Sequence, residues 1–482
     1  MQSTPQAPVA APAAPKRRWR WKLLGGVALV MLLTPVAFYF IAGWWAERGL
    51  QELYAEIDAD DPNWRWHDLI AELEPPPDAE NAATQIIKVQ ALLGRFNPIG
   101  KGGKWEQAPL HHRNARVAEV YVQPLREAFA ALPKDALIEA RKLKDMPEGR
   151  FPIEAVDNPF EMLVPYLQDT RAIFNLLQAD SVLRTQDGDF DGAAESCLAM
   201  LNAVHAINDH PTLIGQLVRM AGQAIAIAEI ERLLGQGVVS EKNLAKLQAS
   251  LEREADAKVL YYGMRGERAS GHQFFSAVRA GKTSLSNTLG GGRKGPANFH
   301  DRMLDTFPGI ITQGHPEYLR MMHEMTQASK LPEREREEAF QKIESKIRQS
   351  KTFAVKLLVP GVMKVSETWQ RSQVYLRSAY TAIAAERYRL KKQKWPASLQ
   401  ELVNEGLLKE IPKDPYDGQT LRWRLTPNGG AMVYSIGRDK IDNGGTLNRG
   451  NPIAANTDLG FELWALSGRG APPPAVKENP GE

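Results

Sequence analysis

The sequence is nearly free of cysteine, since Cys197 is the only one among 482 residues. A single cysteine excludes a disulfide within the chain and a zinc site built from cysteine ligands. The sequence also lacks a Gly-x-Ser-x-Gly nucleophile elbow, so acyl transfer of that type has no support. No complete catalytic motif is present, and the residues alone name no substrate.

Three patterns resemble known motifs but are incomplete. Gly281-Lys282-Thr283 matches the end of a phosphate-binding P-loop, but Ser276 stands where the pattern requires its first glycine. His323-Glu324 begins like the zinc motif HExxH, but Gln327 replaces the second histidine. His111-His112 are neighbours, which would point about 100° apart on a helix and would not readily share a metal. We therefore expect neither a nucleotide site nor a metalloprotease centre.

The formal charge of +3 is mostly local. Five basic residues lie close together near the N-terminus: Lys16, Arg17, Arg18, Arg20 and Lys22. Such a cluster suits the phosphates of an inner membrane leaflet, and we expect no nucleic-acid partner.

One long apolar run follows this cluster. Leu23 to Trp45 contains no charged residue. At about 1.5 Å rise per residue, a helix of this length matches the roughly 30 Å hydrocarbon layer of a bilayer. Tryptophans flank both ends, as is typical of the two membrane interfaces. The run predicts a transmembrane helix over 23–45, and the lipid bilayer is the first expected partner.

The flanking charges predict the orientation. Basic residues precede the span and acidic residues follow it, so we expect the N-terminus in the cytoplasm and the bulk in the periplasmic or exoplasmic space. A cleaved signal peptide is the alternative, but its apolar region would usually be only about 7–15 residues long. Ala42-Gly43-Trp44 is also a poor cleavage site, which favours a retained anchor in the inner membrane.

Beyond the anchor, the sequence predicts a mainly α fold with an irregular helical domain that contains αα-hairpins. Apolar residues at helical spacing predict helices over 78–96, 161–185, 211–234, 241–263 and 332–350.

The predicted domain organisation has five parts. It comprises a disordered basic tail (1–22), the transmembrane helix (23–45), a helical exoplasmic domain (46–360), a small α+β module (361–466) and a disordered tail (467–482).

The C-terminal module has a distinct pattern. A helix over 365–392 is followed by Trp395-Pro396, and alternating apolar residues at 421–425 and 432–436 predict a β-hairpin. Two further motifs are Ile-Pro-Lys-Asp-Pro-Tyr at 411–416 and Tyr-Ser-Ile-Gly-Arg-Asp at 434–439. With Trp395-Pro396, these motifs resemble, in order and spacing, the globular module of the major pseudopilins of type II secretion.

This resemblance implies a calcium ion in the loop after the hairpin. The ligand candidates are Asp439, Asp442, Asn443 and Asp458. Calcium prefers six to eight oxygen ligands, which such carboxylates, amides and nearby carbonyls can supply. The alternative is an Asx-turn loop without a metal, held by side-chain to backbone hydrogen bonds.

The expected function is a structural or interaction role for a membrane-anchored envelope protein, with another envelope protein as partner. One alternative is a hydrolase in which Glu267, Arg268 and His272 act as an acid–base set in a cleft. The other alternative is an accessory component of a type II secretion-like apparatus.

Overall fold

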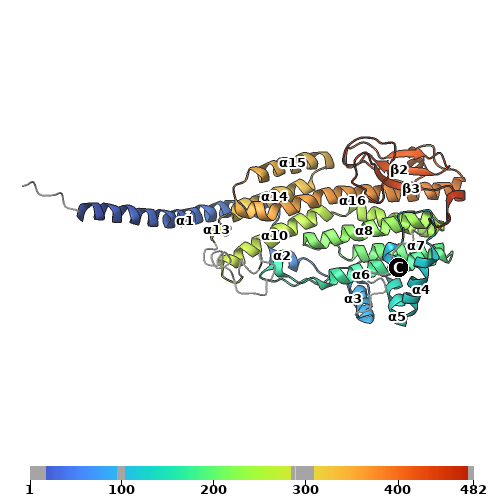
Figure 1. The fold of residues 1–482 in the computed structure, drawn as a ribbon, viewed down its shortest axis with the longest axis horizontal. Helices are drawn as coiled ribbons and strands as arrows, with labels where there is room; N and C mark the ends of the chain where they lie inside the picture. Colours follow the sequence, from blue (N-terminus) through green and yellow to red (C-terminus); the bar gives the residue numbers. More distant parts are fainter. Residues whose placement is uncertain (1–17, 95–103, 284–287, 289–308, 476–482) are drawn as a thin grey trace, which may run out of the picture.

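The computed structural model describes residues 18–94, 104–283, 288 and 309–475. The chain is mainly helical, with one small antiparallel sheet (Figure 1). The helices are α1 (Arg18–Asp60), α2 (Trp66–Ala71), α3 (Ala82–Leu93), α4 (Glu119–Ala130), α5 (Lys134–Lys142), α6 (Pro165–Gln186), α7 (Phe190–His205), α8 (Leu213–Leu234), α9 (Glu241–Asp256), α10 (Val259–Arg279), α13 (Gly309–Thr312), α14 (His315–Lys330), α15 (Glu333–Gln349), α16 (Phe353–Lys392) and α17 (Gln400–Asn404). The strands are β1 (Arg422–Leu425), β2 (Ala431–Ser435) and β3 (Leu459–Leu463).

Helix α1 is one uninterrupted helix of 43 residues, and it projects from one end of an elongated body (Figure 1). Its N-terminal half exposes large apolar side chains, among them Leu29, Leu32, Phe40, Trp44 and Trp45. Its C-terminal half enters the body, where Leu50, Leu53 and Ile57 are buried with Trp64 and Leu319. The two halves of α1 therefore have opposite surroundings.

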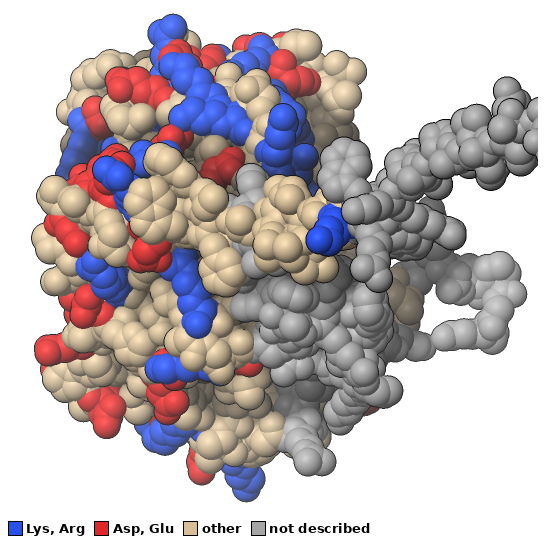
Figure 2. Space-filling view, turned by 90° about the vertical axis from the view of Figure 1, so that its left-hand side faces the viewer, with Lys and Arg blue, Asp and Glu red and all other residues tan. Residues whose placement is uncertain are grey.

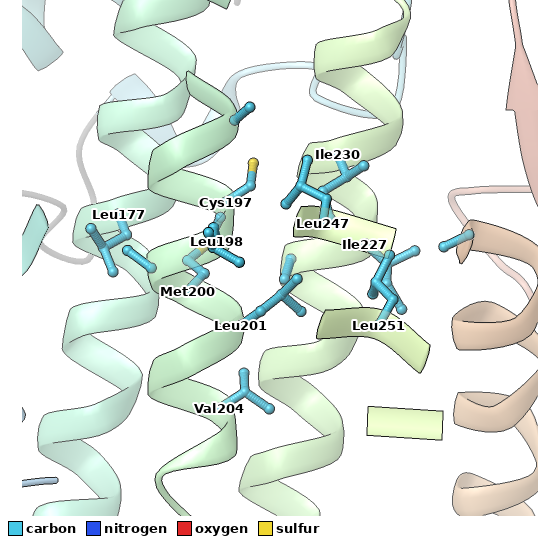
Figure 3. Packing of buried hydrophobic residues seen from close by; sticks show 14 of the residues in the cluster. Leu177, Cys197, Leu198, Met200, Leu201, Val204, Ile227, Ile230, Leu247 and Leu251 are labelled. Carbon is cyan, nitrogen blue, oxygen red and sulfur yellow. The ribbon is translucent and has the colours of Figure 1, made fainter. Parts of the chain in front are cut away.

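The largest core lies among α6, α7, α8, α9 and α16. Side chains from α7, α8 and α9, including Leu201, Ile227 and Leu251, fill the space between these helices (Figure 3). Side-chain caps fix where the helices begin: the side chains of Asp189, Thr212 and Ser240 accept backbone N–H groups in the first turns of α7, α8 and α9.

Helix α8 is the one helix in the described part of the chain whose length and hydropathy would suit a membrane span. However, 67% of its most apolar stretch is buried inside the body. Within α1, length and hydropathy single out only a shorter apolar stretch, Lys22–Thr34. The membrane span over 23–45 therefore stays a prediction.

The sheet has the order β1-β2-β3, and both pairs are antiparallel. Val433 of β2 lies opposite Trp423 of β1 and Phe461 of β3. The predicted hairpin is present as β1 and β2, whereas β3 was not predicted. Val433 and Phe461 belong to the same core as Leu376 and Ile383 of α16, so the sheet packs on that helix.

Several predicted boundaries need correction. The boundary between residues 360 and 361 falls inside α16, a single helix of 40 residues. The helix predicted over 241–263 is two helices, because the chain is extended at Ala257 between α9 and α10. Residues 18–22 of the predicted basic tail belong to α1, and residues 1–17 lie outside the described residues.

The tail predicted to be disordered from residue 467 is held against the body as far as residue 475. The buried guanidinium of Arg469 donates to both oxygens of Glu386 at 2.9 Å. The carbonyl of Ala471 accepts the N–H of Arg116 at 2.9 Å. These long-range contacts cannot be recognised from a composition rich in Pro and Gly, and residues 476–482 lie outside the described residues.

Candidate functional site

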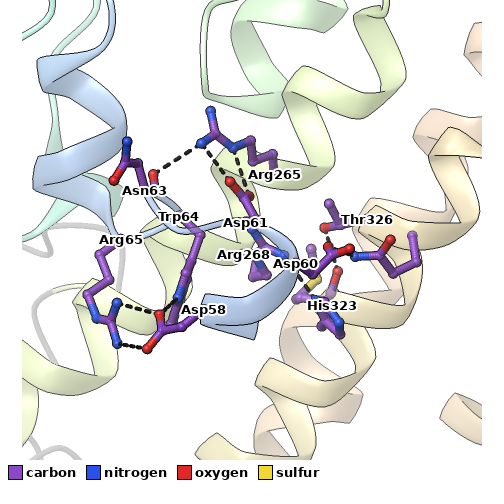
Figure 4. Close-up of polar contacts among 12 residues, drawn as sticks. Asp58, Asp60, Asp61, Asn63, Trp64, Arg65, Arg265, Arg268, His323 and Thr326 are labelled. Carbon is purple, nitrogen blue, oxygen red and sulfur yellow. Dashed lines mark hydrogen bonds and ion pairs between the residues drawn. The ribbon is translucent and has the colours of Figure 1, made fainter. Parts of the chain in front are cut away.

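A network of charged side chains holds the C-terminal end of α1 against α10 and α14 (Figure 4). The carboxylate of Asp61 accepts from Arg265 Nε at 2.9 Å and Nη2 at 2.8 Å, and it also accepts from Arg268. Arg268 Nη1 lies 3.0 Å from His323 Nδ1. Asp61, Arg268 and His323 are buried, so the network is largely shielded from water.

The charges in this network stabilise one another. Burial alone would raise the pKa of Asp61, but the guanidinium groups of Arg265 and Arg268 lower it overall, so the group stays a carboxylate. Removing one partner from a buried ion pair typically costs about 3–5 kcal/mol, because the other charge is left unpaired. The network therefore ties the C-terminal end of α1 to α10 and α14.

Two adjoining hollows lie beside α15 and α16. The groove, of about 580 Å³, has an apolar lining that includes Phe340, Ile347 and Tyr416. The pocket, of about 410 Å³, lies toward the start of α10. Arg336 and Trp369 line both hollows, with the Arg336 guanidinium carbon 4.2 Å from the centre of the Trp369 ring.

The structure brings three of the four predicted calcium ligands to one loop. The two carboxylate oxygens of Asp458 accept the backbone N–H groups of Asn443 at 3.3 Å, Gly445 at 2.7 Å and Thr446 at 3.2 Å. Asp442 Oδ1 accepts the N–H of Gly444 at 2.9 Å. Asp458 is buried and thus acts as the anchor of this loop.

Asp439 has the same kind of role in the preceding turn. Its carboxylate accepts the backbone N–H groups of Ile441 at 3.2 Å and Asn456 at 3.1 Å. Among the described residues, no three His, Cys, Asp or Glu side chains are placed as a metal-binding group. The hydrogen bonds from these carboxylates to backbone N–H groups are those that the Asx-turn alternative describes. Calcium binding stays a prediction, which thermal unfolding with millimolar calcium or a chelator tests.

Asp414 is a buried residue whose role the sequence did not reveal. Its carboxylate accepts from the backbone N–H groups of Tyr416 at 2.9 Å and Ile436 at 3.1 Å, and from Ser435 Oγ at 2.8 Å. Arg422 Nη1 also donates to it. Asp414 therefore ties the 411–416 motif to the end of β2. The only local signal was the Asp-Pro turn, which does not indicate a distant partner.

The alternative acid–base set is not assembled in the structure. Arg268 belongs to the α1 network, and His272 Nδ1 lies 3.2 Å from His315 Nε2. Glu267 instead accepts the backbone N–H of Leu213 in the first turn of α8, and burial raises the pKa of Glu267 to about 7. Neither Glu267 nor His272 lines the groove or the pocket.

Comparisons with known proteins do not assign this chain to a family. No protein-family model matches the chain, and neither the curated proteins nor the solved structures contain a match. The resemblance to the pseudopilin module therefore depends on the residues quoted above and stays a prediction.

Proposed function

We propose that this chain is a single-pass membrane protein of the cell envelope, with its N-terminus in the cytoplasm and its body on the far side. The observation that carries the proposal is the exposed apolar half of α1, where Leu32 is 67% exposed. Exposing apolar surface to water costs about 25 cal/mol per Å², whereas acyl chains remove this cost. A bilayer is the environment that suits this half of the helix.

The dimensions support the same proposal. From Lys22 to Trp45 the helix extends about 35 Å at 1.5 Å per residue, enough to cross the roughly 30 Å hydrocarbon layer. Burial in the body begins at Leu50, directly beyond this stretch. Figure 2 looks at the end of the body from which α1 leaves, where charged and uncharged residues are mixed over the visible face. This end would face the membrane.

For the body, we propose a structural or protein-interaction role with another envelope protein. The groove between α15 and α16 supports this role, because its lining combines apolar and charged residues, as recognition surfaces do. An accessory role in a type II secretion-like apparatus is a second proposal, supported by the order of helix, turn and hairpin in 365–436. Co-purification with a pseudopilus or its membrane platform tests that second proposal.

Extraction of membranes with alkaline carbonate tests the anchor. We expect the full chain, with its N-terminus intact, to remain in the membrane pellet and to be released only by detergent. An external protease should digest the body in spheroplasts while an N-terminal tag stays protected. Release of the intact chain into the alkaline supernatant would contradict the proposal.

A further inference from the structure

The pocket of about 410 Å³ is formed where several helices begin or end. On one side α9 ends and α10 begins, and on another α14 ends and α15 begins. The third wall is α16, which contributes Trp369, Gln373 and Arg377. Segments separated by more than a hundred residues therefore build a single hollow.

Positive charge predominates in the lining. The pocket is lined by four cationic side chains and two carboxylates, so the net charge of its lining is +2. The cationic residues are Lys258, Lys330, Arg336 and Arg377, and the acidic residues are Asp256 and Glu333. Arg377 pairs with Glu333 at 3.0 Å, and Lys330 pairs with Asp60 at 3.1 Å. Among the described residues, Lys258 and Arg336 have no acidic partner within ion-pair distance. Their charges are available to an anion.

The two helices that begin at the pocket add to this potential. The first turn of α10 contributes Leu260 and Tyr261 to the lining, and the first turn of α15 contributes Glu333 and Arg336. Neither helix has a side-chain cap at its N-terminus. Uncapped N–H groups and the positive end of a helix dipole both favour negative charge nearby.

Three polar atoms at the pocket have no hydrogen-bond partner in the free protein. They are Arg336 Nη1, Trp369 Nε1 and Gln373 Oε1. Trp369 is 9% exposed and Gln373 is 2% exposed. Buried donors and acceptors are usually paired, and leaving them unpaired is costly. A ligand that supplies one acceptor group and one donor would satisfy all three atoms.

We propose that this pocket binds a small organic anion. Its carboxylate or phosphate accepts from Arg336 and Trp369, and its hydroxyl or amino group donates to Gln373. All three residues line the pocket but these atoms are buried in the free protein, so the proposal requires their side chains to turn toward the ligand when it binds. The volume matches that of small-molecule sites, which hold roughly 300–1,000 Å³.

Binding can be measured by calorimetry on the full chain in detergent. Citrate serves as a hydroxy-carboxylate probe and glycerol 3-phosphate as a hydroxy-phosphate probe, with chloride at equal ionic strength as the blank. We expect saturable binding of at least one probe, and the stronger of the two identifies the anionic group.

Trp369→Phe is the most specific variant. It keeps an aromatic ring against Arg336 and removes an N–H that has no partner to lose, so the melting temperature of the free protein should change little. We expect binding to weaken about tenfold, as is typical for the loss of one hydrogen bond to a charged group. Arg336→Gln should weaken binding by at least as much.

Arg334→Gln is the matched control, because it removes the same charge from the same turn of α15 while its side chain is 89% exposed. This control should bind like the wild type. The proposal is wrong if neither probe binds more than chloride does. It is also wrong if Trp369→Phe and Arg336→Gln bind as tightly as Arg334→Gln.

Discussion

Two apolar helices of this chain have opposite environments. Helix α8 satisfies length and hydropathy criteria for a membrane span, yet it is mostly buried among other helices. The N-terminal half of α1 exposes its apolar side chains and has no charged residue from 23 to 45. Hydropathy alone therefore does not show whether an apolar helix of this protein is buried or exposed.

The polar residues of α8 explain why it belongs in the protein core. Arg219 donates to both oxygens of Glu254 on α9, at 3.0 and 2.9 Å. Arg232 donates to Glu229 within α8 at 3.1 and 3.2 Å. These charges would be costly against lipid, but in the protein core each has a partner, on α9 for Arg219 and within α8 for Arg232. The apolar half of α1 has no such groups and needs no such partners.

An arginine introduced into each of the two helices should have the largest effects and tests whether their environments differ. Ile230→Arg puts an unpaired charge into the core at a fully buried position, and we expect a loss of more than about 4 kcal/mol in the free energy of unfolding. Leu32→Arg should leave urea unfolding of the body unchanged, but should weaken membrane insertion by about 2.5–3.5 kcal/mol. Similar unfolding losses in the two variants would mean that both helices are core helices.

A second pair of variants compares the buried charged network at the end of α1 with an exposed ion pair of the same helix. Asp61→Ala leaves Arg265 and the buried Arg268 without their shared carboxylate, and should cost about 3–5 kcal/mol. Glu52→Ala removes an exposed pair with Arg48 within α1 and should cost about 1 kcal/mol or less. Urea unfolding in detergent measures both, and equal losses would show that the buried network does not hold α1 to the body.

Glu267 should produce a smaller effect that depends on pH. Burial beside the first turn of α8 raises its pKa from 4.5 to about 7, so between these values the folded state binds more protons than the unfolded state. Its contribution to stability is therefore complete below pH 4.5 and is lost as the pH rises to about 7. Glu267→Gln should gain roughly 1–3 kcal/mol at pH 8 and nothing at pH 4. An identical pH profile for variant and wild type would show that Glu267 does not titrate in this way.

Sequence patterns predicted the elements that depend on local periodicity. The predicted helices over 161–185, 211–234 and 332–350 correspond closely to α6, α8 and α15, and the hairpin is present. These segments bury one continuous apolar face, which the spacing of their residues reveals directly.

The features that the sequence did not predict are defined by contacts between residues far apart in the chain. Strand β3 is five residues long and is defined by its pairing with β2. The break between α9 and α10 contains neither Pro nor Gly, so no local residue marks it. Asp61 and Arg265 are 204 residues apart, and nothing near either residue indicates the other. Neither the network at α1 nor the unpaired groups around the pocket could have been found before the helices were placed.

The most direct test of the account compares single cysteines introduced at two positions of α1 in intact membranes. Leu32 is 67% exposed and the Glu52 side chain is 74% exposed, so the protein itself shields neither position. The native thiol of Cys197 is buried and its pKa is raised by that burial, which keeps background labelling low. With a water-soluble maleimide, Leu32→Cys should stay unmodified while Glu52→Cys reacts. Equal labelling of the two would contradict a bilayer around the first half of α1.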